Sequence, residues 1–336
     1  MKNLARPLLI CFVLLLITAI LSIAVGSIDI PIQTTLQALI NPRQPEVNPT
    51  FISILWDLRL PRTLLLILVG AGLAGSGCAY QGLFRNPLAD PYLIGAASGA
   101  GLGAVLAITI HWPASILGYL TIPAAGFMGA VLTVVVVFSI ARVGRSSPIT
   151  TLILAGVAVS SFATALTSLL LINASGELRR ALVWLVGGST MSGWQPVLGA
   201  LPYILIGLGT LLSMGHALNV LQFGDDQARQ LGLRVSLARI LIIIAATLTT
   251  AAAVAFTGII GFVGLIIPHV MRTLFGGDYK HLLPLSILGG SIFLLLADIL
   301  ARTLLAPQEL PVGILTALAG APFFLFILRK SKQPFW

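Results

Sequence analysis

The chain reads Ala297-Asp298-Ile299-Leu300-Ala301-Arg302 near its end, then Glu309-Leu310-Pro311-Val312-Gly313 and Gly320-Ala321-Pro322-Phe323-Phe324. These stretches place an aspartate, an arginine and a glutamate among apolar residues. A charge among apolar helices is costly unless it has a partner or a function. The fold must therefore be one in which such charges are paired or used.

The composition indicates a membrane protein. Of the 336 residues, 57% are hydrophobic and 9% are charged, and the mean hydropathy is +1.04. The 34 glycines and 19 prolines fit lipid-embedded helices, in which small residues let backbones approach closely. Because a spanning helix needs about 20 apolar residues, we predict an all-α polytopic membrane protein in which residues 1–336 form a single transmembrane domain of about ten spans. The charge-free windows place the spans near 8–26, 64–83, 92–110, 116–140, 149–172, 196–216, 240–257, 259–274, 283–305 and 312–328.

The amino terminus predicts the orientation. Lys2 and Arg6 precede an apolar run, Leu8 to Gly26, that is longer than a usual signal-peptide core, so we expect a retained span that starts in the cytoplasm. Ten spans return the carboxy terminus to the same side. The inner side then holds Lys2, Arg6, Arg85, Arg142, Arg145, Arg229, Arg234, Arg239, Arg272, Lys280, Arg329, Lys330 and Lys332, and the outer side holds Arg43, Arg59, Arg62, Arg179, Arg180 and Arg302. This division obeys the positive-inside rule, and the outer residues need a separate explanation.

Two distant segments resemble each other. The stretch from Leu58 to Arg62 opens one apolar run, and the stretch from Leu233 to Arg239 opens another about 175 residues later. A Gly/Pro-rich break follows each run. On the predicted topology the first run points inward and the second outward, which is what an inverted repeat requires.

Two stripes of small residues have helical spacing. Gly95, Gly99 and Gly103 recur every four residues and predict close packing against another helix. Gly156, Ser160, Thr164 and Ser168 form a second stripe that is also polar. Its hydroxyls could bond to carbonyls one turn back, or they could line a smooth path for a large solute.

Residues for catalysis are missing. Lysine occurs only at positions 2, 280, 330 and 332, never after a glycine, so the phosphate-binding loop of ATPases is absent. His111, His216, His269 and His281 are scattered, and we expect Cys11 and Cys78 to be buried thiols. We therefore expect no enzyme activity, no cofactor and no metal site. The formal charge of +9 comes from dispersed residues, which argues against nucleic acid as a partner.

Two polar segments interrupt the apolar runs. Phe84 to Pro91 contains two prolines four residues apart and predicts a tight turn. Gln222 to Leu233 contains Asp225, Asp226 and Arg229 in a short helical core bounded by glycines. This segment is either a solvated connector or a docking helix that presents Phe223, Ala228 and Leu231 to a soluble partner.

In several ordered motifs the chain resembles the FecCD permease family, the membrane subunits of type II ABC importers for ferric siderophores, haem and vitamin B12. The resemblance runs from about residue 55 to residue 328. The motifs are Arg59-Leu60-Pro61-Arg62, Gln81 with Arg85-Asn86-Pro87-Leu88-Ala89-Asp90-Pro91, Gly261-Phe262-Val263-Gly264-Leu265-Ile266-Ile267-Pro268-His269, Ala297-Asp298 with Arg302, and Glu309-Leu310-Pro311-Val312-Gly313.

The resemblance implies a BtuC-like type II ABC importer fold with ten transmembrane helices per subunit in a bacterial inner membrane. It implies three kinds of protein partner besides membrane lipid: two copies of an ABC ATPase subunit, a periplasmic or lipid-anchored solute-binding protein, and a second permease copy, either identical or related. The implied cargo is an iron chelate such as a ferric siderophore, haem or cobalamin.

The resemblance also assigns roles to residues. Those expected to couple to the ATPase are Gly224, Asp225, Asp226, Ala228, Arg229, Leu231 and Gly232. Those expected to receive the binding protein are the outward-facing Arg59, Arg62 and Arg302. The expected translocation path contains Gly156, Ser160, Thr164 and Ser168.

Two other functions stay open on the sequence alone. A secondary transporter also uses inverted repeats, and it would need an ion-coupling carboxylate within a span. Asp298 is the candidate, although Arg302 one turn later can simply pair with it. A receptor or scaffold without a transport role would leave the segment from Gln222 to Leu233 unexplained.

Overall fold

The computed structural model describes most of the chain, and its regular elements there are all helical. The described residues are 5–26, 28, 30–31, 33–35, 37, 48–110, 118–141, 149–174, 176–188 and 192–330. Several residues named above lie outside this part of the chain: Lys2, Arg43, His111, Arg142, Arg145 and Lys332.

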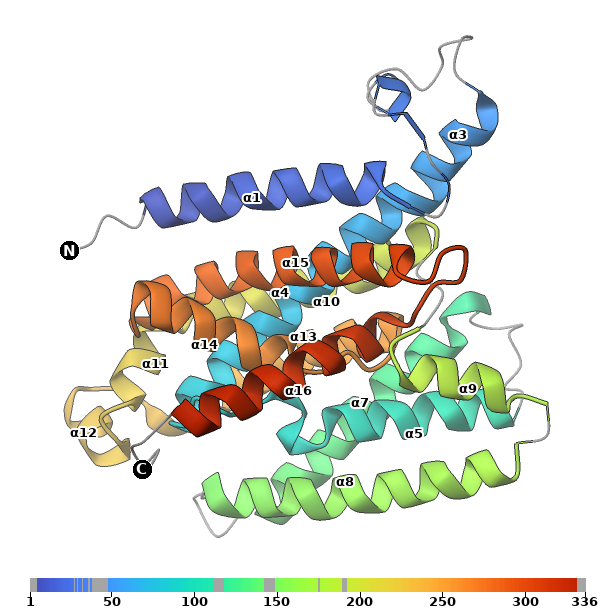
Figure 1. Ribbon diagram of the computed structural model, residues 1–336. Helices are drawn as coiled ribbons and strands as arrows, with labels where there is room; N and C mark the ends of the chain where they lie inside the picture. The colour runs from blue at the N-terminus through green and yellow to red at the C-terminus, as the bar shows by residue number, and fades with distance from the viewer. Residues whose placement is uncertain are drawn as a thin grey trace.

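Ten apolar helices form the bundle (Figure 1). Seven of them are long and apolar enough to cross a membrane, and three are shorter. The long ones are α1 (Ala5–Ala24), α4 (Leu60–Leu83, continuous with α3 and η1), α7 (Thr121–Ala141, preceded by η3, Gly118–Leu120), α8 (Ile149–Ile172), α10 (Trp194–Ser213), α13 (Val235–Thr257) and α15 (Tyr279–Thr303); the shorter ones are α5 (Ala96–Thr109), α14 (Val263–Phe275) and α16 (Val312–Lys330). The predicted polytopic all-α fold is confirmed, with seven candidate spans and three shorter apolar helices in place of ten full-length spans.

Short helices sit at the two ends of the bundle. They are α3 (Pro49–Ser53), the π-helix η1 (Ile54–Arg59), α9 (Leu178–Leu185), α11 (Gly215–Leu221) and α12 (Asp225–Gln230). The 3₁₀ helix η2 (Pro91–Ile94) lies within the bundle, where the Leu93 carbonyl meets Gly156 of α8. The start of α1, the end of α16 and α12 lie at one end, which we call the inner end (Figure 1). α3, α9 and the end of α15 lie at the opposite end, which we call the outer end (Figure 1).

Some helices begin earlier than the charge-free windows predicted. The second helix starts at Leu60 and follows α3 and η1 without a break, although Arg59 and Arg62 lie at its start. α13 starts at Val235, before Arg239. In each case the arginine is bound by acceptors of the protein itself, so its charge does not end the helix.

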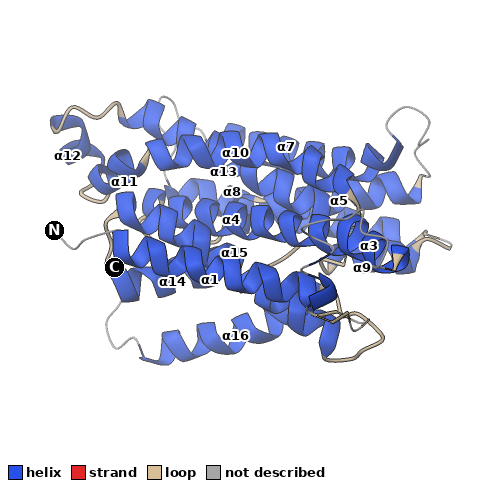
Figure 2. Ribbon diagram, turned by 90° about the horizontal axis from the view of Figure 1, so that it is seen from above, coloured by secondary structure: helices blue, strands red, loops and turns tan. Residues whose placement is uncertain are grey.

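The centre of the bundle consists of α4, α13 and α15, and α1, α7 and α8 lie at its periphery. In the continuous helix that ends with α4, 83% of the residues of an apolar 18-residue stretch are buried. In α8 only 22% of such a stretch is buried. Small residues allow the central packing: a Cβ on Gly77 would collide with the carbonyl of Gly264, and one on Gly70 with that of Gly290. Figure 2 shows the long helices side by side along one direction, with α16 on one flank.

The two Gly/Pro-rich breaks have matching positions in the fold. α4 runs from the outer to the inner end and is followed by η2 and the 14-residue α5. α13 runs the opposite way and is followed by a break and the 13-residue α14. This is the arrangement that the predicted inverted repeat requires. The Tyr92 hydroxyl donates to the Ile260 carbonyl over 2.8 Å and so joins the two breaks.

The predicted packing stripe is confirmed for α5. A Cβ on Gly99 or Gly103 would collide with backbone carbonyls of α7, so the two helices meet backbone to backbone. Gly95 has a different role: it precedes the helix with φ of +86°, in the left-handed region that favours glycine.

Candidate functional site

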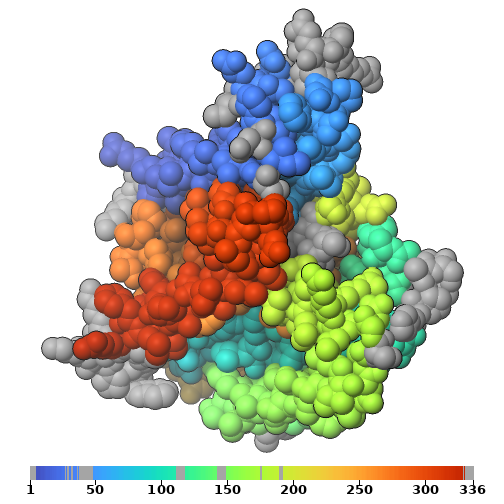
Figure 3. All heavy atoms as spheres, turned by 45° about the vertical axis from the view of Figure 1, so that its right-hand side comes forward, coloured from blue at the N-terminus to red at the C-terminus, as the bar shows by residue number. Residues whose placement is uncertain are grey.

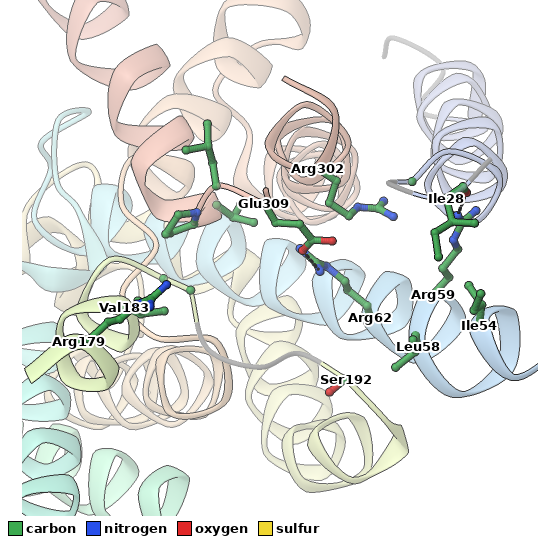
Figure 4. Close-up of a pocket in the computed structure, with 16 residues that line it drawn as sticks. Ile28, Ile54, Leu58, Arg59, Arg62, Arg179, Val183, Ser192, Arg302 and Glu309 are labelled. Atoms are coloured by element: carbon green, nitrogen blue, oxygen red, sulfur yellow. Dashed lines mark hydrogen bonds and ion pairs between the residues drawn. The ribbon is translucent and has the colours of Figure 1, made fainter. Parts of the chain in front are cut away.

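A basic cavity of about 530 Å³ opens at the outer end (Figure 4). It lies where the end of α15, α9 and the segment from α3 to α4 come together (Figure 3). Four arginines and one glutamate line it: Arg59, Arg62, Arg179, Arg302 and Glu309. The cavity therefore contains all three arginines that the sequence predicted as a docking site.

Arg59 binds the end of α1. Its Nη1 donates to the carbonyls of Ile23 and Ala24 over 2.9 and 2.7 Å, and its Nη2 donates to the carbonyl of Ile28. The residue is only 6% exposed. It lines the outer cavity, but its guanidinium is already bound, because the last carbonyls of a helix lack partners and attract a cation. Its docking role stays a prediction.

Arg302 binds the same helix end from α15. It donates to the carbonyls of Val25 and Ser22, each over 3.0 Å, and to the Ser22 hydroxyl. It is 4% exposed. It also lines the outer cavity, and its docking role likewise stays a prediction. Two arginines from different helices thus satisfy the carbonyls at the end of α1.

Asp298 carries the charge that balances this cluster. Its side chain is fully buried, and its Oδ1 accepts from Nε and Nη2 of Arg62 over 3.0 and 2.7 Å. Nε of Arg302 lies 2.9 Å from Oδ2 as an ion pair without hydrogen-bond alignment. The predicted pairing with Arg302 is confirmed. Asp298 lies close to the outer end of α15 and is neutralised there, so the secondary-transporter alternative loses its coupling carboxylate.

Arg62 connects the buried cluster to the cavity. Its Nη1 donates to Oε2 of Glu309 over 2.7 Å, and its side chain is 21% exposed. Of the three arginines predicted to dock a partner, Arg62 is the most accessible.

α9 adds two arginines that the sequence counted on the outer side without giving them a role. Arg179 and Arg180 are both exposed. Arg180 lies 3.7 Å from Glu177 in an ion pair, whereas Arg179 lines the cavity. The helix is amphipathic, with Ala181 and Trp184 buried. An amphipathic pattern in the outer loop was the signal that could have placed Arg179 at the site.

The inner end carries a second candidate surface. The predicted short helix is α12, and it lies between Gly224 and Gly232, whose φ angles of +98° and +83° are left-handed. Nη2 of Arg239 lies 2.9 Å from Oδ2 of Asp225 and so fixes α12 to α13. Arg229 pairs with Asp226 on the exposed side over 3.1 Å.

The exposed surface around α12 is apolar as well as charged. Phe223 and Leu231 are each 65% exposed. Ala228, which we expected beside them, is fully buried in the core, so this part of the prediction was wrong. The Ala228 methyl group packs into the core and so anchors the short helix to the bundle. The surface available to a partner therefore consists of Phe223, Leu231 and the neighbouring charges.

A groove of about 660 Å³ follows α8, lined by apolar and hydroxyl side chains. Ser160, Thr164 and Ser168 line it, as the stripe predicted. Gly156 does not: it is buried, and a Cβ there would collide with the carbonyl of Leu93. The Ser168 hydroxyl donates to the Thr164 carbonyl over 3.0 Å. Because the Ser168 hydroxyl is hydrogen-bonded within its own helix, it is not held ready for a solute in the groove.

Asp90 faces the same groove from the break after α4. It caps η2 by accepting from the Tyr92 amide over 2.8 Å. Burial raises the pKa of Asp90 to about 6. Of the described residues that line the groove, it is the only one with a charge.

Gln81 and Arg272 bind together at the inner end of the core. Nη2 of Arg272 donates to Oε1 of Gln81 over 3.1 Å and to the Tyr279 hydroxyl over 3.0 Å. Nε2 of Gln81 donates to the Leu265 carbonyl over 3.2 Å. These residues hold α4, α14 and α15 together, which gives the Gln81 motif a structural role.

Known proteins share this chain's sequence and fold. The FecCD transport family matches residues 14–330. The chain is 44% identical over 291 residues to the cobalamin import system permease protein BtuC of Halobacterium salinarum, covering 87% of this chain and 77% of the relative. It is 37% identical to the hemin transport system permease protein HmuU of Yersinia pestis, over 96% of this chain and 94% of that protein. A solved structure of an inward-facing metal-chelate type ABC transporter matches with a TM-score of 0.83 and 34% identity, covering 98% of this chain and all of that one.

Proposed function

The chain belongs to the FecCD transport family and is a permease subunit of an ABC importer, and from this we propose how it works and what it carries. We propose that it moves an iron chelate, haem or cobalamin into the cell. The named relatives carry cargo of this kind. The groove along α8 is suited to the passage of a large solute, because the small side chains of its wall offer few groups that would bind the solute tightly.

The observation that carries the coupling proposal is the exposed apolar pair that flanks α12. Phe223 and Leu231 stand at the inner end, on either side of a helix that α13 holds in place. Apolar side chains presented beside charges on a fixed helix suit a protein partner. We propose that this surface contacts an ATPase subunit, with two such subunits serving two permease copies.

The outer cavity supports docking of a solute-binding protein. Arg59, Arg62 and Arg302 line it, and the excess of arginine over carboxylate attracts acidic surfaces. On this proposal the inner end of the bundle is cytoplasmic, both termini are cytoplasmic, and residues 1–336 act as one permease domain.

The proposed mechanism is alternating access driven by the partners. ATP binding moves the ATPase subunits, and α12 transmits this motion to α13 through the pair between Asp225 and Arg239. The helix bundles then tilt, and the cargo passes between two permease copies along the groove of α8. No step requires chemistry from the permease itself.

Reconstitution tests this function. The permease is placed in lipid vesicles with its ATPase subunit and the solute-binding protein encoded beside it, and the ligand that co-purifies with the binding protein is identified. We expect concentrative uptake of that ligand only when ATP and all partners are present. Uphill transport by the permease alone, driven by an ion gradient, would refute the proposal.

A bulky residue in the groove should block transport. Thr164 is exposed and lines the groove, so Thr164→Leu fills the path without disturbing the core. We expect the uptake rate to fall at least about tenfold, an increase of about 1.4 kcal/mol in the barrier, while ATPase association is unchanged.

The matched control for the groove is Ala158→Leu. Ala158 is exposed on the same helix but does not line the groove, so this variant adds a leucine at a site where the cargo does not pass. We expect wild-type uptake. Equal rates for Thr164→Leu and wild type would remove α8 from the path.

A further inference from the structure

An apolar groove of about 300 Å³ lies between α7 and α13, which pack against each other on the flank opposite α16 (Figure 2). Val134 and Ile243 are buried at its base, whereas Val135 and Ile244 on its two walls are 54% and 59% exposed. Among the described residues, no charged side chain lines it. The groove therefore opens at the surface of the bundle and presents apolar groups there.

The two hydroxyls that line the groove are already hydrogen-bonded. Ser139 donates to the Val135 carbonyl over 2.7 Å, one turn back in α7. The hydroxyls of Thr247 and Tyr80 share a hydrogen bond of 3.1 Å in the core. The groove therefore offers a polar solute little to bind, whereas an acyl chain gains van der Waals contact with its walls.

The groove has the length of one leaflet of a bilayer. Its lining residues run from Val131 to Ser139 in α7 and from Ile240 to Leu248 in α13, a distance of about 12 Å at the rise of an α-helix. The hydrocarbon core of a bilayer is about 30 Å thick, so one leaflet takes about half of that. Because α7 ends and α13 begins at the inner end, the groove lies in the inner half of the bundle (Figure 1).

An exposed arginine lies just beyond the inner end of the groove. Arg234 directly precedes α13, six residues before Ile240. Among the described residues its guanidinium has no hydrogen bond or ion pair, whereas Arg239 is bound to Asp225. A long basic side chain beside a spanning helix reaches the level of the lipid headgroups. Arg234 can therefore bind a lipid phosphate without breaking a contact within the described part of the chain.

We propose that the groove binds one acyl chain of an anionic phospholipid from the leaflet at the inner end, with the lipid phosphate on Arg234. Three observations select a lipid as the occupant: the groove lies between membrane-spanning helices, it is as long as one leaflet, and it ends beside a cation. This site goes beyond the proposed function and does not depend on it.

The bound lipid supports the base of α12. Ile240 lines the groove directly after Arg239, whose Nη2 fixes α12 to α13 through Asp225. An acyl chain that packs against both α7 and α13 at this level restrains the start of α13. The lipid thus stabilises the part of the bundle that carries α12.

Lipid binding to the purified permease tests this site. The permease is delipidated in detergent, and native mass spectrometry gives the Kd of the first bound phosphatidylglycerol and of phosphatidylcholine with the same acyl chains. For wild type we expect phosphatidylglycerol to bind about fivefold more tightly, because a basic residue at the membrane surface attracts an anionic headgroup. Arg234→Gln should remove this preference, and Arg234→Lys should keep most of it.

Two substitutions fill the groove from opposite walls. Ile244→Trp and Val135→Trp place a ring where the acyl chain lies, and both positions are exposed, so the core is undisturbed. We expect each variant to bind both lipids about tenfold more weakly, because the displaced chain loses its contacts with the walls.

Two further variants are the controls. Leu132→Trp adds the same ring at a position of α7 that is 56% exposed and does not line the groove. Arg329→Gln removes a positive charge at the inner end of α16, on the opposite flank. Both should bind the two lipids as wild type does.

The outcomes are distinct. Unchanged binding of phosphatidylglycerol in both groove-filling variants would overturn the acyl-chain site. A headgroup preference that persists in Arg234→Gln, or that wild type lacks, would overturn the assignment of an anionic lipid to Arg234. Because the permease is measured without partners, these results leave the proposed function untouched.

Discussion

Replacing Leu231 with aspartate should nearly abolish uptake. Leu231 is 65% exposed on the surface beside α12, so the change leaves the core intact. On the proposed function it places a charge within the apolar part of the contact with the ATPase subunit, where burying it is costly. Truncating a central interface residue costs about 2 kcal/mol or more, so we expect ATPase association to weaken at least about thirtyfold. Pull-down of the ATPase and ATP-dependent uptake in vesicles measure the two effects.

Two variants control for this effect. Leu305 is 56% exposed at the outer end, so Leu305→Asp adds the same charge far from the ATPase and should leave its association unchanged. Leu231→Met keeps an apolar side chain and should retain most of the uptake. Ala228→Asp is unsuitable, because Ala228 is buried and its replacement would damage the fold. If Leu231→Asp coupled ATP hydrolysis to uptake as well as wild type does, α12 would not be the ATPase contact.

Replacing Asp298 with asparagine should destabilise the outer end strongly. Its carboxylate is fully buried between Arg62 and Arg302, and asparagine leaves two guanidinium groups close together without their shared anion. Removing one partner of a buried ion pair costs about 3 to 5 kcal/mol. We expect a matching loss in the free energy of unfolding, measured in detergent by denaturant titration.

Glu309 provides the comparison for Asp298. Both carboxylates bind Arg62, but the side chain of Glu309 is 40% exposed. An exposed pair contributes at most about 1 kcal/mol, because water and salt screen it. Glu309→Gln should therefore change stability little. Similar losses for both variants would mean that burial does not decide the strength of this cluster.

The number and order of the spanning helices could be predicted because each needs a long apolar segment. Their starts could not, since a window of low charge treats every arginine as the end of a span. Arg59 and Arg62 show why this fails. One binds backbone carbonyls and the other binds carboxylates, so neither charge needs water. The acceptors come from residues far away in the chain, and sequence windows do not include them.

The sequence predicted where the candidate sites lie better than it predicted which way their side chains point. The Gly224–Gly232 segment forms the expected short helix, but Ala228 faces the core. The stripe on α8 lines a groove, but Gly156 packs against η2. Helical spacing places residues on one face and does not show how far along the helix that face stays open. Arg179 was missed as a residue of the outer cavity, because the segments that line this cavity are far apart in the chain.

The clamp on α1 has a consequence for how the subunit can move. Arg59 at the start of α4 and Arg302 near the end of α15 hold the same helix end, and α4 touches α15 backbone to backbone at Gly70 and Gly290. We therefore expect these three helices to move together when the subunit changes conformation, so that α1 follows the central pair although little of its own surface is buried.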